Sequence, residues 1–178
     1  MAPEAGFPQT SPTFAGLPSS AADVSAARFV VLPIPYEATT EWLCGTRHAP
    51  AEIVHCSRLL ELYDHELDTD TSRAGIATVD ELSPVLSGPE GMVAVVKEHV
   101  GQWLDRNKVP ILLGGEHTIT IGAAAAAAER VSDLSILQLD AHSDLRDSYL
   151  GSRWGQATVM RRIHEICPSI TAMGIRSL

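Results

Sequence analysis

Short apolar runs alternate with amphipathic segments along the chain from Arg28 onward. Residues 29–34 form a short β-branched run that prolines stop at its end, which is consistent with a buried strand. Four further apolar runs predict strands at residues 75–79, 109–113, 135–139 and 170–175.

Helices are predicted between these runs. The first begins at Pro50, because proline is tolerated in the first helical turn. Steps of three and four give it an apolar face of Ile53, Cys56, Leu60 and Tyr63. The others are predicted from Pro89 to about Asn107, over the alanine-rich residues 118–130, and around residues 159–166. Strands that alternate with helices indicate an α/β fold with a mostly parallel sheet.

Residues 1–27 differ from the rest of the chain. They contain four prolines, many Ala and Ser residues and no Lys or Arg, and neither a helical nor a strand period is present. We therefore expect an irregular or disordered lead-in over residues 1–27 and a single domain over residues 28–178.

Composition narrows the functional classes. The chain has 22 Asp and Glu residues against 13 Lys and Arg, a net charge of -9, which argues against nucleic-acid binding. The uncharged stretch 118–128 is too short to cross a membrane, and the N-terminus lacks the pattern of a secretory signal. Cys44, Cys56 and Cys167 do not form a disulfide or zinc pattern. These features predict a cytoplasmic protein without a membrane partner.

Two polar segments begin where predicted strands stop, Gly114–His117 and Asp140–Asp144. Sites in open parallel sheets form beyond the carboxyl ends of the strands. The distance of 23 positions from His117 to Asp140 fits one helix and one strand. We therefore expect the two strands, which end at Leu113 and Leu139, to be parallel neighbours about 4.8 Å apart.

These segments favour a metal site. Asp140, His142 and Asp144 alternate, so an extended segment would point all three side chains the same way. Together with His117 they offer two imidazoles and two carboxylates, which suit a divalent ion such as manganese. Either segment alone could instead cap a helix or form a turn. A dinuclear phosphoesterase uses similar ligands, but the sequence has no Asn-His-Glu-type partner segment.

The chain resembles the ureohydrolase superfamily of arginases and agmatinases, and most closely the agmatinases. Gly114–His117 and residues 140–147 resemble the first two manganese motifs of that family. The resemblance extends over nearly the whole chain, with further similar stretches at residues 14–18, 32–37, 45–47, 59–64, 160–162 and 174–177. It implies a three-layer α/β/α sandwich, incomplete at the C-terminus, and hydrolysis of a guanidinium group to release urea.

The resemblance also assigns roles. His117 and Asp144 correspond to ligands of one manganese ion, His142 to a ligand of a second ion, and Asp140 to a bridge between the two. The family has a third motif with two more carboxylate ligands, which residues 1–178 lack, so the chain is expected to be an N-terminal portion that supplies only part of the ion pair. Gln156 stands where many agmatinases have a proton-shuttling His, and glutamine does not exchange a proton near neutral pH.

Two functional hypotheses follow. The first is a manganese-dependent, agmatinase-like amidinohydrolase that converts agmatine or a related guanidino compound to urea and an amine such as putrescine, as in polyamine biosynthesis. The second is a non-catalytic metal-binding relic that acts only in assembly or regulation. The resemblance further implies a homo-oligomer. Trp42, Trp103 and Trp154 are expected to serve packing rather than substrate contact.

Overall fold

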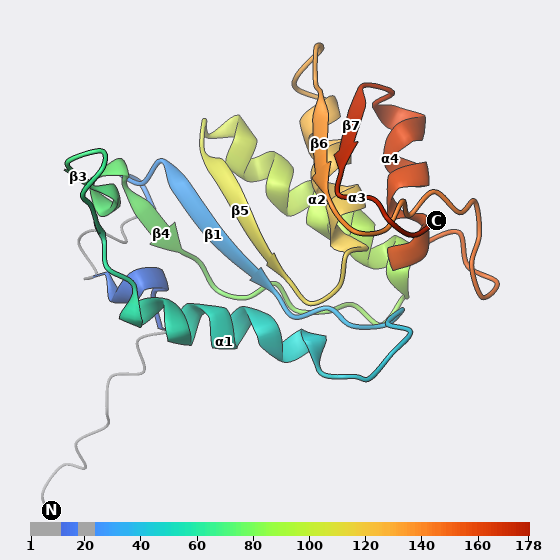
Figure 1. The fold of residues 1–178 in the computed structure, drawn as a ribbon, viewed down its shortest axis with the longest axis horizontal. Coiled ribbons are helices and arrows are strands. Elements are labelled where there is room, and N and C mark those ends of the chain that lie inside the picture. The colour runs from blue at the N-terminus through green and yellow to red at the C-terminus, as the bar shows by residue number, and fades with distance from the viewer. Residues whose placement is uncertain (1–11, 18–23) are drawn as a thin grey trace, which may run out of the picture.

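Apart from two short antiparallel strands at residues 63–64 and 69–70, which the hydrophobic pattern does not predict, strands and helices follow one another in the predicted order (Figure 1). The computed structural model describes residues 12–17 and 24–178. Its elements are β1 (Phe29–Ile34), α1 (Ala49–Cys56), β2 (Tyr63–Asp64), β3 (Thr69–Asp70), β4 (Ile76–Thr78), α2 (Pro89–Asp105), β5 (Val109–Gly114), α3 (Ile119–Ala128), β6 (Ile136–Leu139), α4 (Val159–Ile166) and β7 (Ile170–Met173). The predicted α/β class is confirmed.

The central strand is β1, which pairs in parallel with β4 on one side and with β5 on the other. A parallel strand covered on both faces reads as a continuous apolar run, and this accounts for the composition of residues 29–34. Val30, Val31, Leu32 and Ile34 are all fully buried.

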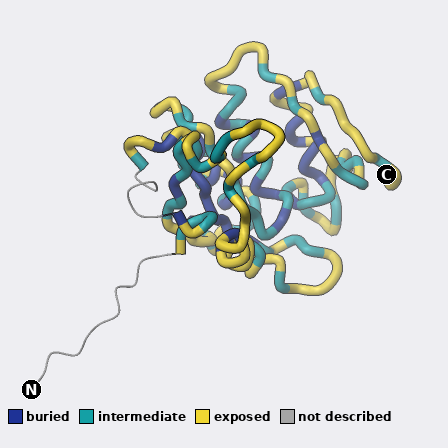
Figure 2. The backbone as a smooth tube through the Cα atoms, turned by 60° about the vertical axis from the view of Figure 1, so that its left-hand side comes forward, coloured by how far each residue is buried: buried dark blue, intermediate teal, exposed yellow. Residues whose placement is uncertain are grey.

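Helices cover both faces of this sheet. On one face, Leu32 and Ile34 pack in a common core with Met92 and Val96 of α2 and Ile119 of α3. On the other face, α1 contacts β1 and β5. The result is the expected three-layer arrangement, with α1 on one side and α2 with α3 on the other (Figure 1). Figure 2 shows buried segments toward the interior of the molecule and exposed segments in the outer loops.

Small residues allow α3 to lie close to α2. A Cβ atom added to Gly122 would lie only 2.5 Å from the backbone oxygen of Val93 in α2. The neighbouring alanines present little side-chain volume, and Ala124 and Ala126 are buried. The alanine-rich segment is therefore a helix that packs through its backbone, not only one of high intrinsic propensity.

The prediction that the strands ending at Leu113 and Leu139 are neighbours is wrong. Strand β5 pairs with β1, whereas β6 pairs in parallel with β7 in a separate two-stranded sheet. The 23 positions from His117 to Asp140 require only that the second strand run parallel to the first. They do not make the two strands adjacent, because consecutive strands are neighbours only about two-thirds of the time. Apolar side chains stay exposed on β5 and on β6, including Ile111 of β5 and Leu137 and Leu139 of β6.

The predicted apolar face of the first helix is also wrong. Helix α1 ends at Cys56, so Leu60 and Tyr63 lie outside it, and Ile53 is exposed. The helix buries Pro50 and Val54 instead. It ends because the chain tightens into a 3-10 turn, Ser57–Leu59, and the Ser57 hydroxyl donates to the backbone oxygen of Val54.

Part of the predicted lead-in is described. Residues 14–16 form a 3-10 turn, in which the N–H of Phe14 donates to Thr78 Oγ1 and that of Ala15 to Ser57 Oγ, both at 2.8 Å. Residues 1–11 and 18–23 lie outside the described residues. Within the described part of the chain, no helix combines the length and the apolar composition needed to span a membrane.

Candidate metal centre

His117 lies just beyond the carboxyl end of β5. The N–H groups of Gly115 and Glu116 continue the parallel ladder by donating to the backbone oxygens of Ile34 and Tyr36, at 3.2 and 3.0 Å. A Cβ atom at position 115 would lie 2.0 Å from the Tyr36 oxygen, so only glycine fits there. The Gly-Gly pair thus lets the strand follow β1 to its end and then turn, which brings His117 to the edge of the sheet.

Asp140 and Asp144 follow strand β6. The N–H of His142 donates to Asp140 Oδ1 at 2.8 Å and closes a turn. Asp144 has a φ of 48°, and its backbone oxygen accepts the N–H groups of Met160 (3.0 Å) and Arg161 (3.2 Å) from the first turn of α4. These bonds fix the Asp144 backbone relative to the start of α4.

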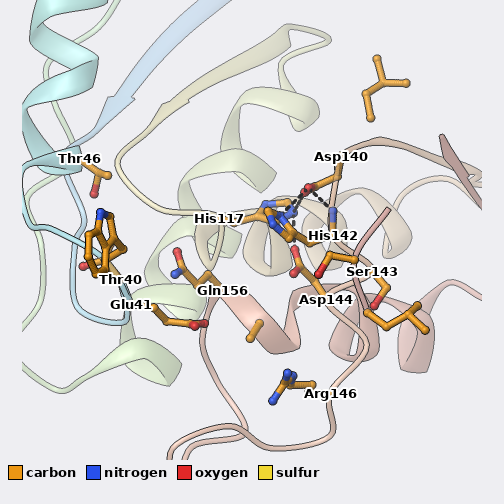
Figure 3. Close-up of a pocket in the computed structure, with 15 residues that line it drawn as sticks. Thr40, Glu41, Thr46, His117, Asp140, His142, Ser143, Asp144, Arg146 and Gln156 are labelled. Carbon is orange, nitrogen blue, oxygen red and sulfur yellow. Dashed lines mark hydrogen bonds and ion pairs between the residues drawn. The ribbon is translucent and has the colours of Figure 1, made fainter. Parts of the chain in front are cut away.

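His117 meets both carboxylates (Figure 3). Its Nε2 atom lies 3.6 Å from Asp140 Oδ2 and 3.6 Å from Asp144 Oδ2. One possible ligand atom from each of the three residues lies within 4.8 Å of the other two. Ligands about 2.1 Å from one ion are roughly 3.0–3.5 Å apart. The two separations of 3.6 Å at His117 Nε2 are close to this range, as expected for ligands of one divalent cation.

His142 lies beside this group rather than in it. Its Nδ1 atom is 3.3 Å from Asp140 Oδ1, but 66% of its side chain is exposed. Residues 140–144 do not form a regular strand, since His142 forms an isolated parallel bridge with Ser177 and Asp144 lies in the left-handed region. Even so, Asp140, His142 and Asp144 line one cavity, as their alternation predicts. Three of the four predicted ligands, His117, Asp140 and Asp144, thus form one group, and His142 lies beside Asp140 on the same cavity.

Hydrogen bonding leaves one nitrogen of His117 free for a metal ion. Its Nδ1 atom lies 3.0 Å from Thr120 Oγ1, whereas Nε2 is buried and has no hydrogen-bond partner in the described structure. A proton on Nδ1, donated to Thr120, would leave the Nε2 lone pair directed at the two carboxylates. A buried polar atom without a partner is costly unless a ligand satisfies it, so the residues fit a divalent cation.

The two carboxylates differ in their electrostatic surroundings. Burial raises the pKa of Asp140, but the N–H of His142 and the charges of His117 and His142 outweigh it, so the pKa lies below its usual value. Burial raises the pKa of Asp144; the nearby carboxylates of Asp140 and Glu41 add to this effect, and the two histidines only partly oppose it. The excess of negative charge favours a cation at this position.

A cavity of about 840 Å³ opens beside the three residues (Figure 3). The loop between β1 and α1 lines it with Thr40, Glu41, Trp42 and Thr46, and the segment before α4 contributes Gln156. Of these residues, the sequence pointed to a functional position only at Gln156. The predicted packing role of Trp42 is wrong, because this residue is 84% exposed and lines the cavity.

Glu116 ties the cavity to the metal-binding turn. Its carboxylate is buried and accepts the N–H groups of Ala38 and Thr39 at Oε2 and the hydroxyls of Thr39 and Thr118 at Oε1, over 2.6–2.8 Å. The Thr39 hydroxyl in turn accepts the N–H of Gln156 at 3.1 Å. The Gly-Gly-Glu-His motif thus holds the β1–α1 loop as well as presenting His117, a role that its sequence does not reveal.

A model described as the Arginase family matches residues 27–178. The chain belongs to this family. N(1)-aminopropylagmatine ureohydrolase of Synechocystis sp. is 37% identical over 159 residues, which cover 85% of this chain and 52% of the relative. Agmatinase of Pyrococcus horikoshii is 33% identical over 156 residues, which cover 87% of this chain and 54% of the relative. This arginase-family chain therefore spans about half the length of the curated relatives it matches.

Solved structures agree with the assignment. Agmatine ureohydrolase of Thermoplasma volcanium superposes with a TM-score of 0.83 at 30% identity, over 94% of this chain and 56% of that protein. Proclavaminate amidino hydrolase of Streptomyces clavuligerus gives a TM-score of 0.83 at 26% identity, over 94% of this chain and 57% of that protein. The expected arginase-like fold is confirmed for the part of it that this chain contains.

Proposed function

We propose that this chain carries the first metal-binding segments of a manganese-dependent amidinohydrolase that acts on agmatine or a closely related guanidino compound. One molecule of water and one of the guanidino compound would give urea and the free amine, which is putrescine when the substrate is agmatine. The supporting observation is the buried Nε2 atom of His117, which faces Asp140 and Asp144 at 3.6 Å beside the cavity.

Each residue has a defined part in this proposal. His117, Asp140 and Asp144 would hold manganese, which oxygen and imidazole ligands suit, and His142 would serve a second ion. A bound divalent ion supplies Lewis acidity and lowers the pKa of water. Thr120 orients the His117 ring through Nδ1.

A non-catalytic metal-binding role is the second candidate. It is favoured by Gln156, which lines the cavity and whose amide cannot carry a proton near neutral pH. In this case the chain would bind manganese and a guanidino compound without releasing urea.

Calorimetric titration with manganese, followed by a urea-release assay on agmatine, tests the proposal. The chain should bind manganese, and His117→Ala should lose that binding while Glu81→Ala, on the exposed surface, keeps it. Absence of manganese binding by the folded chain would refute both candidates. Binding without urea release, even after addition of the remaining segments of a relative, would favour the non-catalytic role.

A further inference from the structure

Glu41 is a carboxylate of the cavity that the metal centre does not use. It belongs to the loop between β1 and α1, and Figure 3 shows its side chain directed into the space beside Gln156 and Arg146. Its charge reaches the metal centre, since it helps to raise the pKa of Asp144. The cavity therefore has a second negatively charged position, apart from the cation-binding residues.

The Glu41 carboxylate is held in position from outside the cavity. The hydroxyl of Tyr149 donates to its Oε2 atom at 3.0 Å. The guanidinium of Arg146 stacks on the Tyr149 ring, 4.7 Å from the centroid, instead of pairing with the carboxylate. Within residues 12–17 and 24–178, Glu41 forms no ion pair with Lys, Arg or His, and its Oε1 atom accepts no hydrogen bond.

The loop that carries Glu41 is fixed at both ends. Before it, Glu116 binds the N–H groups of Ala38 and Thr39. The segment that follows Glu41 is held by Glu37, whose carboxylate accepts the N–H groups of Gly45 at 2.9 Å and Arg47 at 2.8 Å. A carboxylate on a fixed loop loses less freedom when it binds a ligand than one on a free loop, so it can select a ligand by charge.

We propose that Glu41 binds the terminal ammonium group of a linear guanidino substrate whose guanidinium end lies at the metal centre. This inference rests on the proposed function and adds to it the residue that recognises the other end of the substrate. The free Oε1 atom supplies an acceptor for the ammonium, and Tyr149 keeps the carboxylate in place. Glu41 would thereby favour amines such as agmatine over guanidino compounds with an apolar tail.

The experiment compares two probes that differ only in the ammonium group. Agmatine and n-butylguanidine share the guanidinium and the four-carbon chain, and each is titrated into the manganese-loaded chain and its Glu41→Gln variant. A hydrogen bond to a charged group corresponds to roughly a tenfold change in affinity or more, so agmatine should bind about tenfold more tightly than n-butylguanidine. Glu41→Gln should remove most of that preference and leave n-butylguanidine within about twofold.

Two further variants separate the outcomes. Tyr149→Phe should weaken agmatine binding less than Glu41→Gln does, because it removes only the support of the carboxylate. Glu81→Gln, an exposed glutamate outside the cavity, should change neither affinity. Equal loss of both probes in Glu41→Gln, or no preference for agmatine in the unmodified chain, would overturn the role of Glu41 while guanidino binding stands. Failure of both probes to bind would overturn the proposed function as well.

Discussion

Replacement of Glu116 by alanine should destabilise the fold strongly, although Glu116 is not one of the predicted metal ligands. The substitution removes a buried carboxylate that accepts four hydrogen bonds. It leaves the N–H groups of Ala38 and Thr39 and the hydroxyls of Thr39 and Thr118 without this acceptor. The two segments that these bonds join, the β1–α1 loop and the metal-binding turn, then lose their main polar connection.

The magnitude follows from the exposure of these donors. A buried donor without a partner costs about 1–3 kcal/mol, whereas a donor that water can reach costs little. Thr118 is fully buried and Thr39 is partly buried, but Ala38 is exposed. We therefore expect the free energy of unfolding to fall by about 2–4 kcal/mol, or the melting temperature by roughly 5–15 °C for a chain of this size.

Thermal and chemical unfolding of Glu116→Ala, Glu116→Gln and Glu81→Ala provide the assay. Gln preserves the volume and one acceptor oxygen, so its loss should be smaller than that of Ala. Glu81 is exposed, and its replacement should change the free energy of unfolding by less than about 0.5 kcal/mol. If Glu116→Ala melts within about 1 °C of Glu81→Ala, the hydrogen bonds of this carboxylate do not contribute to stability and the reasoning is wrong.

Three other predictions concern the same region. Gly115→Ala should destabilise the chain and weaken manganese binding, because its Cβ atom would overlap the Tyr36 oxygen; thermal unfolding and calorimetry check this, and an unchanged variant would contradict it. Hydrogen bonds, the strongest from the N–H of Arg47, hold the pKa of Glu37 below its usual value. The loop should therefore stay ordered at and above the ordinary pKa of glutamate, and lose its order as the pH falls through the lowered pKa of Glu37. Amide shifts of Gly45 in NMR spectra should report that transition, and a midpoint at or above the ordinary value would be inconsistent with it. Gln156→His alone should not give the 178-residue chain robust urea release from agmatine, because metal ligands and not proton transfer are expected to limit it, and an active variant would disprove this.

The order of the elements other than β2 and β3 could be predicted from the sequence because each has its own local pattern. Proline at the start of α1 and α2 and the apolar runs of β1 and β5 act within a few residues. The partners of each strand depend on packing between distant segments, for which a hydrophobic pattern carries little information. This is why the position of β5 was predicted correctly and its neighbour was not.

The candidate site shows the same difference between features with a local sequence pattern and features that depend on distant contacts. The type and spacing of His117, Asp140 and Asp144 indicated a metal site, since these side chains carry recognisable chemistry. Glu116 and Glu41 gave no such signal, because a carboxylate that binds backbone N–H groups and one on a cavity wall look alike in a sequence. Their roles depend on burial and on contacts 77 and 108 positions away.

The convergence of His117 and Asp144 does not require β5 and β6 to pair, because helices connect the two segments. His117 lies two residues before the start of α3, and α3 packs against α4 through Ile121 and Ala124. The first turn of α4 donates two N–H groups to the backbone oxygen of Asp144. The separation of the two side chains is thus set by how closely α3 approaches α4. Ala124 contributes to that contact, and since a run of alanines has no amphipathic direction, the sequence of α3 gives no sign of the helix that it contacts.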